Sequence, residues 1–400
     1  MVKRYFLNNP FFCIIVLGLM VCLPSLSIDI YVPVMGSMAR ALLTSKASIQ
    51  LTISVFLAGL AIAQLFSGFI ADIIGRRTTL LFGLALYSVM SLLCSFAQSS
   101  DSILYYRILQ GLGCSVIVVC AFAICRDLFE GESLTKTISY ITAIISLSPA
   151  IAPIIGGFIA SISSWRGIFI LLAITGLFLL LMGYVFLPET LNNHKEAMPT
   201  KRAKLLDVYR SLLSNTRFLQ LSLLVSVIYS AYFSYLYNAS FVFESIYRQT
   251  IAITAGLMGL NAFALFLGSA LAPSIVKRIG TQRAVISALF TIIIFSLVLT
   301  LYHAHFHTPS LAVFCSCMFL STFSVAIIVP LMNSESLSAV NQHFASAAAF
   351  SGFIRYGLAS SFGALIASFH LISVHLITAS LLVASFLGLF LLKKAGLARQ

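Results

Sequence analysis

The segment Phe11–Val34 reads FFCIIVLGLMVCLPSLSIDIYVPV and poses the central physical problem of this sequence. It is apolar and long enough to cross a bilayer, which takes about 20 residues. It nevertheless contains a carboxylate, Asp29. Insertion scales put the free-energy cost of an aspartate at membrane depth at about 2.5–3.5 kcal/mol, so such residues are rare and mostly functional. Pro24 and Pro33 flank the acid and predict a kinked or loosened helix around it.

The composition predicts an all-α polytopic membrane protein. The chain has 400 residues, of which 60% are hydrophobic and only 9% charged, whereas soluble domains are about one quarter charged. The apolar runs are about twenty residues long, unlike the alternating ten-residue segments of a β-barrel. About twelve spans are expected, at residues 11–35, 47–70, 78–98, 102–125, 137–161, 167–187, 216–239, 252–273, 283–303, 309–332, 344–368 and 371–392.

The longest polar interval divides these spans into six and six. We therefore expect an N-terminal six-helix bundle at 1–187, a cytoplasmic linker at 188–215 with a short surface helix, and a C-terminal six-helix bundle at 216–400. The loops after the second and the eighth span carry Gly75 and Gly280 at matching places, each beside basic residues. Two pseudo-symmetric bundles around a central cavity are a known transporter architecture.

The net charge of +13 follows from topology rather than from an acidic partner. With the N-terminus inside, 18 of the 24 lysines and arginines fall on the cytoplasmic side and four on the outer side. This is the positive-inside bias, and it predicts that both termini are cytoplasmic. We expect the lipid bilayer as a partner, with basic linker residues near anionic headgroups, no nucleic acid, and a monomer.

No cofactor, metal or catalytic centre is expected. The eight cysteines lie in or beside apolar runs without metal-type pairing, and we interpret them as small apolar fillers. His303, His305 and His307 are interpreted as part of a solvated outer loop rather than a metal site. The sequence contains no Walker motif and no nucleophile–base–orienter trio.

The loop after the second span carries the most specific signal, GFIADIIGRR at 68–77. A glycine at 68 allows two helices to approach closely, and one at 75 allows a tight turn. Asp72 can interact with a helix N-terminus or an arginine and so lock one state of the cavity. The candidate cytoplasmic-gate residues here are Gly68, Asp72, Gly75, Arg76 and Arg77. The loop resembles the G-x-x-x-D-x-x-G-R-[RK] signature of the major facilitator superfamily; an ordinary basic loop is the alternative.

The fourth span places a second charge at the depth of Asp29. Arg107 and Gln110 lie three residues apart on one helical face, and the segment resembles the span-four arginine motif of the same superfamily. We expect Arg107 to restrain the charge of Asp29 as part of the proton-coupling site. The alternatives are that each side chain reaches outward to the nearby membrane surface.

The fifth span resembles the antiporter signature G-x8-G-x3-G-P-x2-G-G. Ser139, Ser148 and Ala152 replace its first three glycines. Small side chains keep the close helix packing that the motif needs, although a generic packing face is the alternative. The predicted packing residues are Pro149, Pro153, Gly156 and Gly157.

Three short segments narrow the resemblance to the Bcr/CflA branch of drug:proton antiporters. They are SIDIYVP at 27–33, RDLF at 126–129 and SWRGIF at 164–169. The resemblance implies a multi-pass protein of a bacterial inner membrane. It also adds Arg126 and Asp127 to the predicted inner gate, where we expect the two to pair near Asp72. Two solvated interface charges are the alternative.

The predicted substrate cavity combines residues of both halves. Several tyrosines and an asparagine crowd the seventh span, which suits a wide apolar drug site, or else an outer aromatic belt. Arg355 could meet an anionic group or Glu335, or serve as a structural polar residue, and these options stay open. The cavity candidates are Tyr31, Gln110, Tyr235, Asn238, Asn261 and Arg355.

The resulting hypothesis is a secondary active transporter, not an enzyme, that exports small amphipathic compounds by alternating access. Asp29 carries the coupling proton, and the resemblance to drug antiporters supplies the direction of transport. The alternative is a proton-coupled carrier of an amino acid or organic acid, in which Arg107 and Arg355 bind the carboxylate. A non-transporting membrane receptor on this fold is a third possibility.

Overall fold

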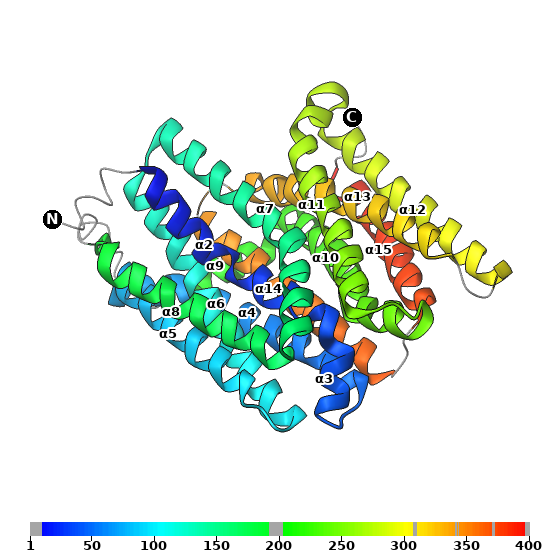
Figure 1. Ribbon diagram of the computed structural model, residues 1–400. Coiled ribbons are helices and arrows are strands. Elements are labelled where there is room, and N and C mark those ends of the chain that lie inside the picture. Colours follow the sequence, from blue (N-terminus) through cyan, green and yellow to red (C-terminus); the bar gives the residue numbers. More distant parts are fainter. Residues whose placement is uncertain are drawn as a thin grey trace.

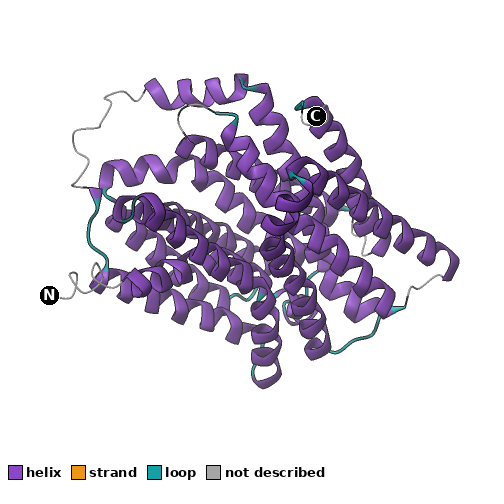
Figure 2. Ribbon diagram, turned by 90° about the horizontal axis from the view of Figure 1, so that it is seen from above, coloured by secondary structure: helices purple, strands orange, loops and turns teal. Residues whose placement is uncertain are grey.

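The structure, a computed structural model, describes residues 10–191, 203–306, 310–340, 342, 344–369 and 373–396. These residues form long helices joined by short loops (Figure 2). In Figure 1 the blue-to-green helices of the first half lie beside the yellow-to-red helices of the second. The most basic part of the predicted linker, 192–202, lies outside the described residues, as does His307.

The first half contains α2 (Pro10–Asp29), the 3₁₀ turn η1 (Val32–Val34), α3 (Met35–Ala41), α4 (Lys46–Ile74), α5 (Arg76–Ser95), α6 (Ser100–Leu128), α7 (Gly131–Ile162) and α8 (Trp165–Phe186). After the short helix α9 (Ala203–Ser214), the second half contains α10 (Thr216–Phe241), the π turn η3 (Val242–Ile246), α11 (Ile251–Ile279), α12 (Thr281–Phe306), α13 (Leu311–Ser338), α14 (Phe344–Ser368) and α15 (Val374–Lys394).

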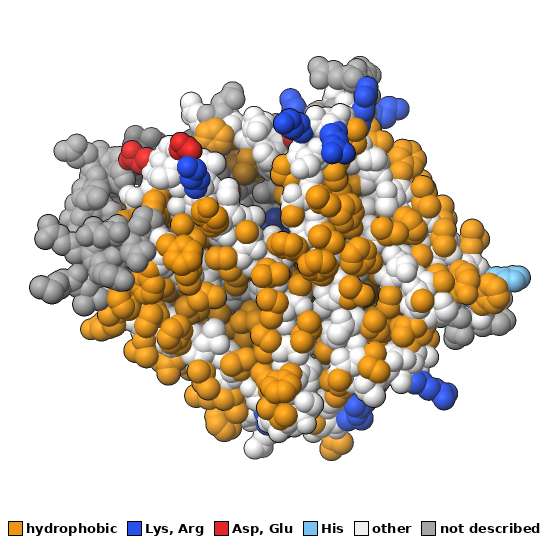
Figure 3. All heavy atoms as spheres, turned by 45° about the horizontal axis from the view of Figure 1, so that its top comes forward, with side chains coloured by type: hydrophobic (Ala, Val, Ile, Leu, Met, Phe, Trp, Pro, Cys, Tyr) orange, Lys and Arg blue, Asp and Glu red, His pale blue; other side chains and the backbone are white. Residues whose placement is uncertain are grey.

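The predicted all-α membrane fold is confirmed. Among the described residues, 11 helical segments are long and apolar enough to span a membrane. The remaining predicted span coincides with α14, which has 25 residues and is rich in serine, glycine and alanine. Figure 3 shows apolar side chains over the middle of the visible face and most charged side chains near its top and bottom, as a surface that faces lipid requires.

Local sequence signals explain where the helices begin and end. The hydroxyls of Ser45 and Ser99 accept hydrogen bonds from backbone N–H groups three residues on, and so cap α4's and α6's first turns. Gly75 ends α4 with φ +116°, and Gly280 ends α11 with φ +83°. Glycine adopts such angles without the steric cost of a side chain. Corresponding places in the two halves therefore use the same turn chemistry.

The two halves meet along two helix pairs, with α4 against α14 and α7 against α11. The second contact depends on small residues in α7. A Cβ atom at Gly157 would lie 2.5 Å from the Ala255 side chain of α11. One at Gly156 would overlap the Ile30 carbonyl, just after α2 ends. Pro149 and Pro153 lie within the same helix.

We predict that Gly156→Ala destabilises the protein, because backbone and not a movable side chain fills the space its methyl group would need. Overpacking of this kind costs about 1–3 kcal/mol. Thermal unfolding in detergent with a thiol-reactive dye measures the effect, since seven of the eight free cysteines are buried.

Gly256→Ala in α11 is the matched control, because no atom lies within 4 Å of the added Cβ. It should keep or slightly raise the unfolding temperature, since alanine has the higher helix propensity. Equal unfolding temperatures for the two variants would contradict the close approach at Gly156.

Candidate substrate and proton site

A cavity of about 450 Å³ lies between the two halves. Helices α2, α6 and α7 form one wall, and α10, α11, α13 and α14 form the other. Two charged side chains line it, Asp29 from the first half and Arg355 from the second. Asp29 is only 6% exposed, and no described cation lies within ion-pair distance of it. A buried carboxylate thus borders the space that both halves share.

The predicted helix break beside the acid is present. Helix α2 ends at Asp29, and the chain turns through η1 before α3 begins. Pro33 has no N–H to bond the Asp29 carbonyl, so the helical ladder cannot continue. The Ser27 carbonyl, left without a helical donor, accepts a hydrogen bond from Arg107 Nη1 at 3.1 Å. Arg107 therefore holds the end of the helix that carries the acid.

Arg107 itself lies inside the first half and does not contact Asp29. Its side chain is completely buried, donates to Gln110 Oε1 at 2.7 Å, and lies 4.2 Å from the centre of the Phe56 ring. Its guanidinium is surrounded by backbone and side-chain oxygens and by aromatic rings rather than by a carboxylate. The hydrogen bond to the Ser27 carbonyl lets Arg107 hold Asp29 in place through the backbone of α2.

Tyr31 and Gln110 belong to this buried network and do not line the cavity, contrary to expectation. The Tyr31 hydroxyl hydrogen-bonds the Thr52 hydroxyl at 2.9 Å, and Gln110 Nε2 donates to Ser91 Oγ at 2.6 Å. The turn after α2 directs Tyr31 into the first half, two residues beyond an acid that faces the cavity. Both residues thus pack inside the first half, next to the helices that form the cavity wall.

The second-half candidates are also divided. Arg355 lines the cavity, whereas Tyr235 and Asn261 line a small separate hollow between α10, α11 and α13. Asn238 instead accepts a hydrogen bond from Gln50 Nε2 of α4 at 3.3 Å. The predicted positions of Tyr235, Asn261 and Asn238 in the main cavity are therefore not observed. Tyr235 and Asn238 lie on other faces of α10 than its cavity-lining residues. Asn261 shares a face of α11 with Leu265, which lines the cavity, but lies one turn further along the helix.

The residues of α10 that do line the cavity are Tyr229, Tyr232, Phe233 and Leu236. The sequence placed the tyrosines of this span, including Tyr229 and Tyr232, in the substrate wall, but it did not single out Phe233 and Leu236. Their i, i+3, i+4, i+7 spacing is the signature of one helical face and could have identified them. It also explains the error at position 235, which belongs to a different face of the same helix.

The cavity is closed at the end that carries α3 and η3, here called the α3 end. Arg40 of α3 forms an ion pair with Glu244 of η3. Lys46 Nζ donates to Ser245 Oγ at 2.8 Å, and Ser240 Oγ donates to the Pro33 carbonyl at 3.2 Å. Each contact joins the first half to the second. Sequence alone offered no signal for pairs about two hundred residues apart.

The opposite end, which carries α9, contains a hollow of about 330 Å³. Phe122 lines both this hollow and the central cavity. The predicted gate residues Gly68, Asp72, Arg76, Arg126 and Asp127 line it from the first half. Tyr209 of α9 and Ala345 and Ser346 of α14 face them. The described conformation is therefore closed at the α3 end and hollowed at the α9 end.

Charges at the hollow form one network within the first half. Arg76 contacts Asp72 at 2.5 Å and Asp127 at 3.5 Å. The Thr190 hydroxyl donates to Asp127 Oδ2 at 2.6 Å. Arg126 is exposed and forms no ion pair with any described residue, so the predicted pairing of Arg126 with Asp127 is replaced by the pair with Arg76.

Glu189 is a functional candidate that sequence reasoning missed. Its carboxylate accepts hydrogen bonds from the Arg76 N–H at 2.8 Å and the Arg77 N–H at 3.2 Å. These are the first two residues of α5, so Glu189 caps a helix N-terminus, where a negative charge is favourable. Arg77 Nη2 also donates to the Tyr184 carbonyl at 2.6 Å. The basic pair of the loop is thereby attached to the end of α8.

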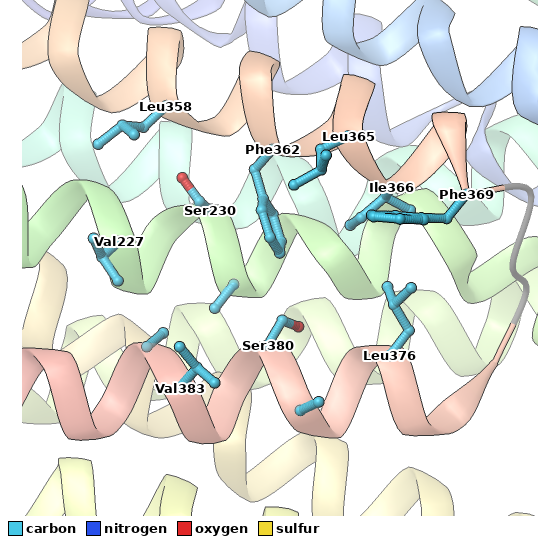
Figure 4. A pocket seen from close by; sticks show the side chains of 13 residues that line it. Val227, Ser230, Leu358, Phe362, Leu365, Ile366, Phe369, Leu376, Ser380 and Val383 are labelled. Atoms are coloured by element: carbon cyan, nitrogen blue, oxygen red, sulfur yellow. The ribbon is translucent and has the colours of Figure 1, made fainter.

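A further hollow of about 380 Å³ lies between α10, α14 and α15. Figure 4 shows Phe362, Leu365 and Val383 among the side chains around it. Among the described residues that line it, none is charged, and the polar side chains are Ser230 and Ser380. None of these described side chains binds or releases a proton near neutral pH. The mixed cavity that contains Asp29 is the candidate site.

Two halves that enclose a charged cavity, closed at one membrane face, define the class of membrane transporters. The family model described as Major Facilitator Superfamily matches residues 17–367. The chain belongs to this superfamily, which confirms the predicted family and identifies the protein as a multi-pass transporter rather than an enzyme.

Named relatives agree with this assignment. The chain is 31% identical over 326 residues to an uncharacterised major-facilitator-type transporter, YdgK, of Bacillus subtilis, covering 78% of this chain and 80% of the relative. It is 27% identical to a bicyclomycin resistance protein homologue of Haemophilus influenzae, with 69% of each chain covered. It is also 32% identical to the multidrug resistance protein MdtL of Escherichia coli, over 58% of this chain and 59% of the relative.

Solved structures share the fold at low sequence identity. A D-xylose–proton symporter superposes with a TM-score of 0.76 at 15% identity, covering 95% of this chain and 97% of that chain. A mutant of the nucleoside transporter NupG gives a TM-score of 0.73 at 12% identity, covering 97% and 100%.

We predict that Glu189→Gln lowers the unfolding temperature, because the charge that caps α5 is lost. Charges at helix N-termini contribute about 0.3–1 kcal/mol, and more where they are partly buried. Thermal unfolding of the purified protein measures the change. Asp207→Asn is the control, since that side chain is exposed, lies beyond the first turn of α9 and makes no ion pair within the described segments. An equal loss in both variants would refute the cap.

Proposed function

We propose that this protein exports small amphipathic compounds in exchange for protons. One observation carries the proposal: Asp29 lines a cavity shared by both halves and has no cationic partner among the described residues. A carboxylate that is free of an ion pair can hold either a proton or a cationic substrate. The names of two relatives, a bicyclomycin resistance protein homologue and a multidrug resistance protein, support a drug as the substrate.

The other wall of the cavity suits such compounds. Tyr229, Tyr232 and Phe233 of α10 offer aromatic faces, and the volume of about 450 Å³ is that of a site for drug-sized molecules. Aromatic rings bind varied apolar surfaces with little directional demand. Such a wall supports breadth of substrate, while the acid on the opposite wall supplies the charge that couples transport to protons.

The contacts between the halves support alternating access. In our proposal the bundles 1–187 and 216–400 rock about the cavity, joined by the linker 188–215. The α9 end and both termini face the cytoplasm of a bacterial cell, so the described conformation opens inward. Outward opening requires breakage of the Arg40–Glu244 contact and closure of the hollow beside Asp72. One proton moved across 100 mV supplies about 2.3 kcal/mol for the cycle.

A carrier of an amino acid or organic acid is the second candidate. As predicted from the sequence, this carrier would bind the substrate carboxylate with Arg107 and Arg355 together. Arg107 already donates to the Ser27 carbonyl and to Gln110 inside the first half, so only Arg355 is available in the cavity. This geometry favours drug export, and the polarity of transport distinguishes the two.

We predict that Asp29→Asn abolishes drug-dependent proton movement. In everted vesicles, addition of a cationic substrate should release protons with the natural chain and should release at least tenfold fewer with the variant. The amide keeps the size of the side chain but cannot take up or release a proton near neutral pH.

The control is Asp101→Asn, an exposed acid in the first turn of α6, which should leave proton release unchanged. The coupling role of Asp29 is excluded if Asp29→Asn vesicles exchange drug for protons at the normal ratio. Proton-driven uptake in right-side-out vesicles, with protons entering together with the solute, would instead favour the metabolite carrier.

We predict that Arg40→Glu opens the α3 end more often, because like charges then replace the ion pair with Glu244. A cysteine at Ser240, which is 1% exposed, should react several-fold faster with a membrane-impermeant thiol reagent. The double change Arg40→Glu with Glu244→Arg should restore slow labelling, and Arg248→Glu nearby should not affect it. Unchanged labelling in Arg40→Glu would show that this contact does not hold the end closed.

A further inference from the structure

Arg355 is a half-buried cation on the cavity wall that the proton-coupling scheme does not use. Its guanidinium lies 4.9 Å from the centre of the Tyr356 ring and 5.5 Å from that of Tyr229. Its Nε is buried and has no hydrogen-bond partner. Glu335, the acid considered as its partner, instead lies 3.8 Å from Arg217. The aromatic rings stabilise the cation but leave it without an anion.

Arg107 shows that an arginine inside this protein can have hydrogen-bond partners even where no carboxylate is near. Arg107 is equally without a carboxylate, yet it donates to the Ser27 carbonyl and to Gln110 Oε1. Its role in the fold is accounted for by those bonds. Arg355 makes no comparable bond to a carbonyl or an amide oxygen in the described structure, and it borders open volume. The planar guanidinium is suited to bind a carboxylate through two parallel hydrogen bonds.

The cavity therefore presents opposite charges on opposite walls. Asp29 comes from α2 of the first half and Arg355 from α14 of the second, and they form no ion pair with each other. Of the described residues that line this cavity, these two carry the charges, and the aromatic face of α10 also contributes to the wall. A molecule with a cationic group, an aromatic body and an anionic group would complement all three features at once.

We propose that Arg355 is a specificity-determining residue that binds the carboxylate of zwitterionic aromatic substrates, whose amine is directed to Asp29. This inference rests on the proposed function, because it names the substrate class of the same site. A ligand held by both charges connects the two halves directly. Such a ligand would therefore bind best in the conformation in which the distance between Asp29 and Arg355 matches the distance between its two charged groups.

The test compares two probes that differ in one charge. Norfloxacin carries an amine, an aromatic body and a carboxylate, and its methyl ester lacks only the negative charge. Affinity for each is measured by equilibrium dialysis with the full chain in lipid nanodiscs. The natural protein should bind norfloxacin more tightly than the ester. Arg355→Gln should weaken norfloxacin binding roughly tenfold or more, as expected for a lost hydrogen bond between charged groups, and change ester binding less than about threefold.

Two further variants sharpen the result. Arg355→Lys keeps the charge without the planar fork and should recover part of the norfloxacin affinity. Arg283→Gln, an exposed arginine of α12, should alter neither affinity. Unchanged ester binding also shows that Arg355→Gln is folded. Equal losses for both probes would assign Arg355 a structural role, and equal affinities of the natural protein for both probes would overturn the proposal.

The binding test is separate from the test of proton coupling. If Asp29→Asn vesicles still exchange drug for protons while Arg355→Gln discriminates between the probes, the coupling scheme fails and the role of Arg355 stands. If Asp29→Asn uncouples transport but Arg355→Gln binds both probes normally, the role of Arg355 is excluded and the exporter remains.

Discussion

The hydrogen bond from Arg107 to the Ser27 carbonyl is the contact on which the site depends. A proline beyond the acid interrupts α2, and an interrupted helix inside a membrane leaves carbonyls that water cannot satisfy. Arg107 supplies the missing donor and thereby fixes the orientation of the chain at Asp29. Surrounding rings and hydroxyls make the buried cation tolerable. The acid can then face the cavity without an ion pair, because the arginine that neighbours its helix is bonded to backbone.

Charge is distributed differently in the cavity and at its two ends. At the α3 end, Arg40 and Glu244 form a pair that links the halves. At the α9 end, Arg76 connects Asp72 and Asp127, all within the first half. In the cavity, Asp29 and Arg355 stay apart. Paired charges can stabilise one conformation, whereas unpaired buried charges favour ligands that compensate them. This division matches a transporter whose ends open and close around a fixed binding site.

Small residues set how closely the halves approach. Gly156 and Gly157 let α7 contact the chain after α2 and helix α11, and Gly352 lies close to Gln64 of α4. In a bilayer, lipid tails compete with apolar side chains, so shape complementarity and not hydrophobicity brings helices together. The serines and alanines that replace glycines elsewhere in the fifth span preserve smallness. The replacement of three signature glycines by serine or alanine is therefore compatible with the close packing of α7 against its neighbours.

The sequence by itself determined the long apolar helices, the family and the presence of an acid within a membrane span, because hydropathy, turn glycines and a costly intramembrane charge are local properties. It also indicated that Arg107 and Asp72 are special. Only the tertiary structure decided which groups each side chain contacts. Arg107 donates to a backbone carbonyl, and Glu189 caps α5. Arg355 borders the cavity, whereas Tyr31 and Tyr235 do not. The physical reason is helix rotation. A residue's depth follows from its place in the chain, but the direction it faces depends on how its helix packs against the others.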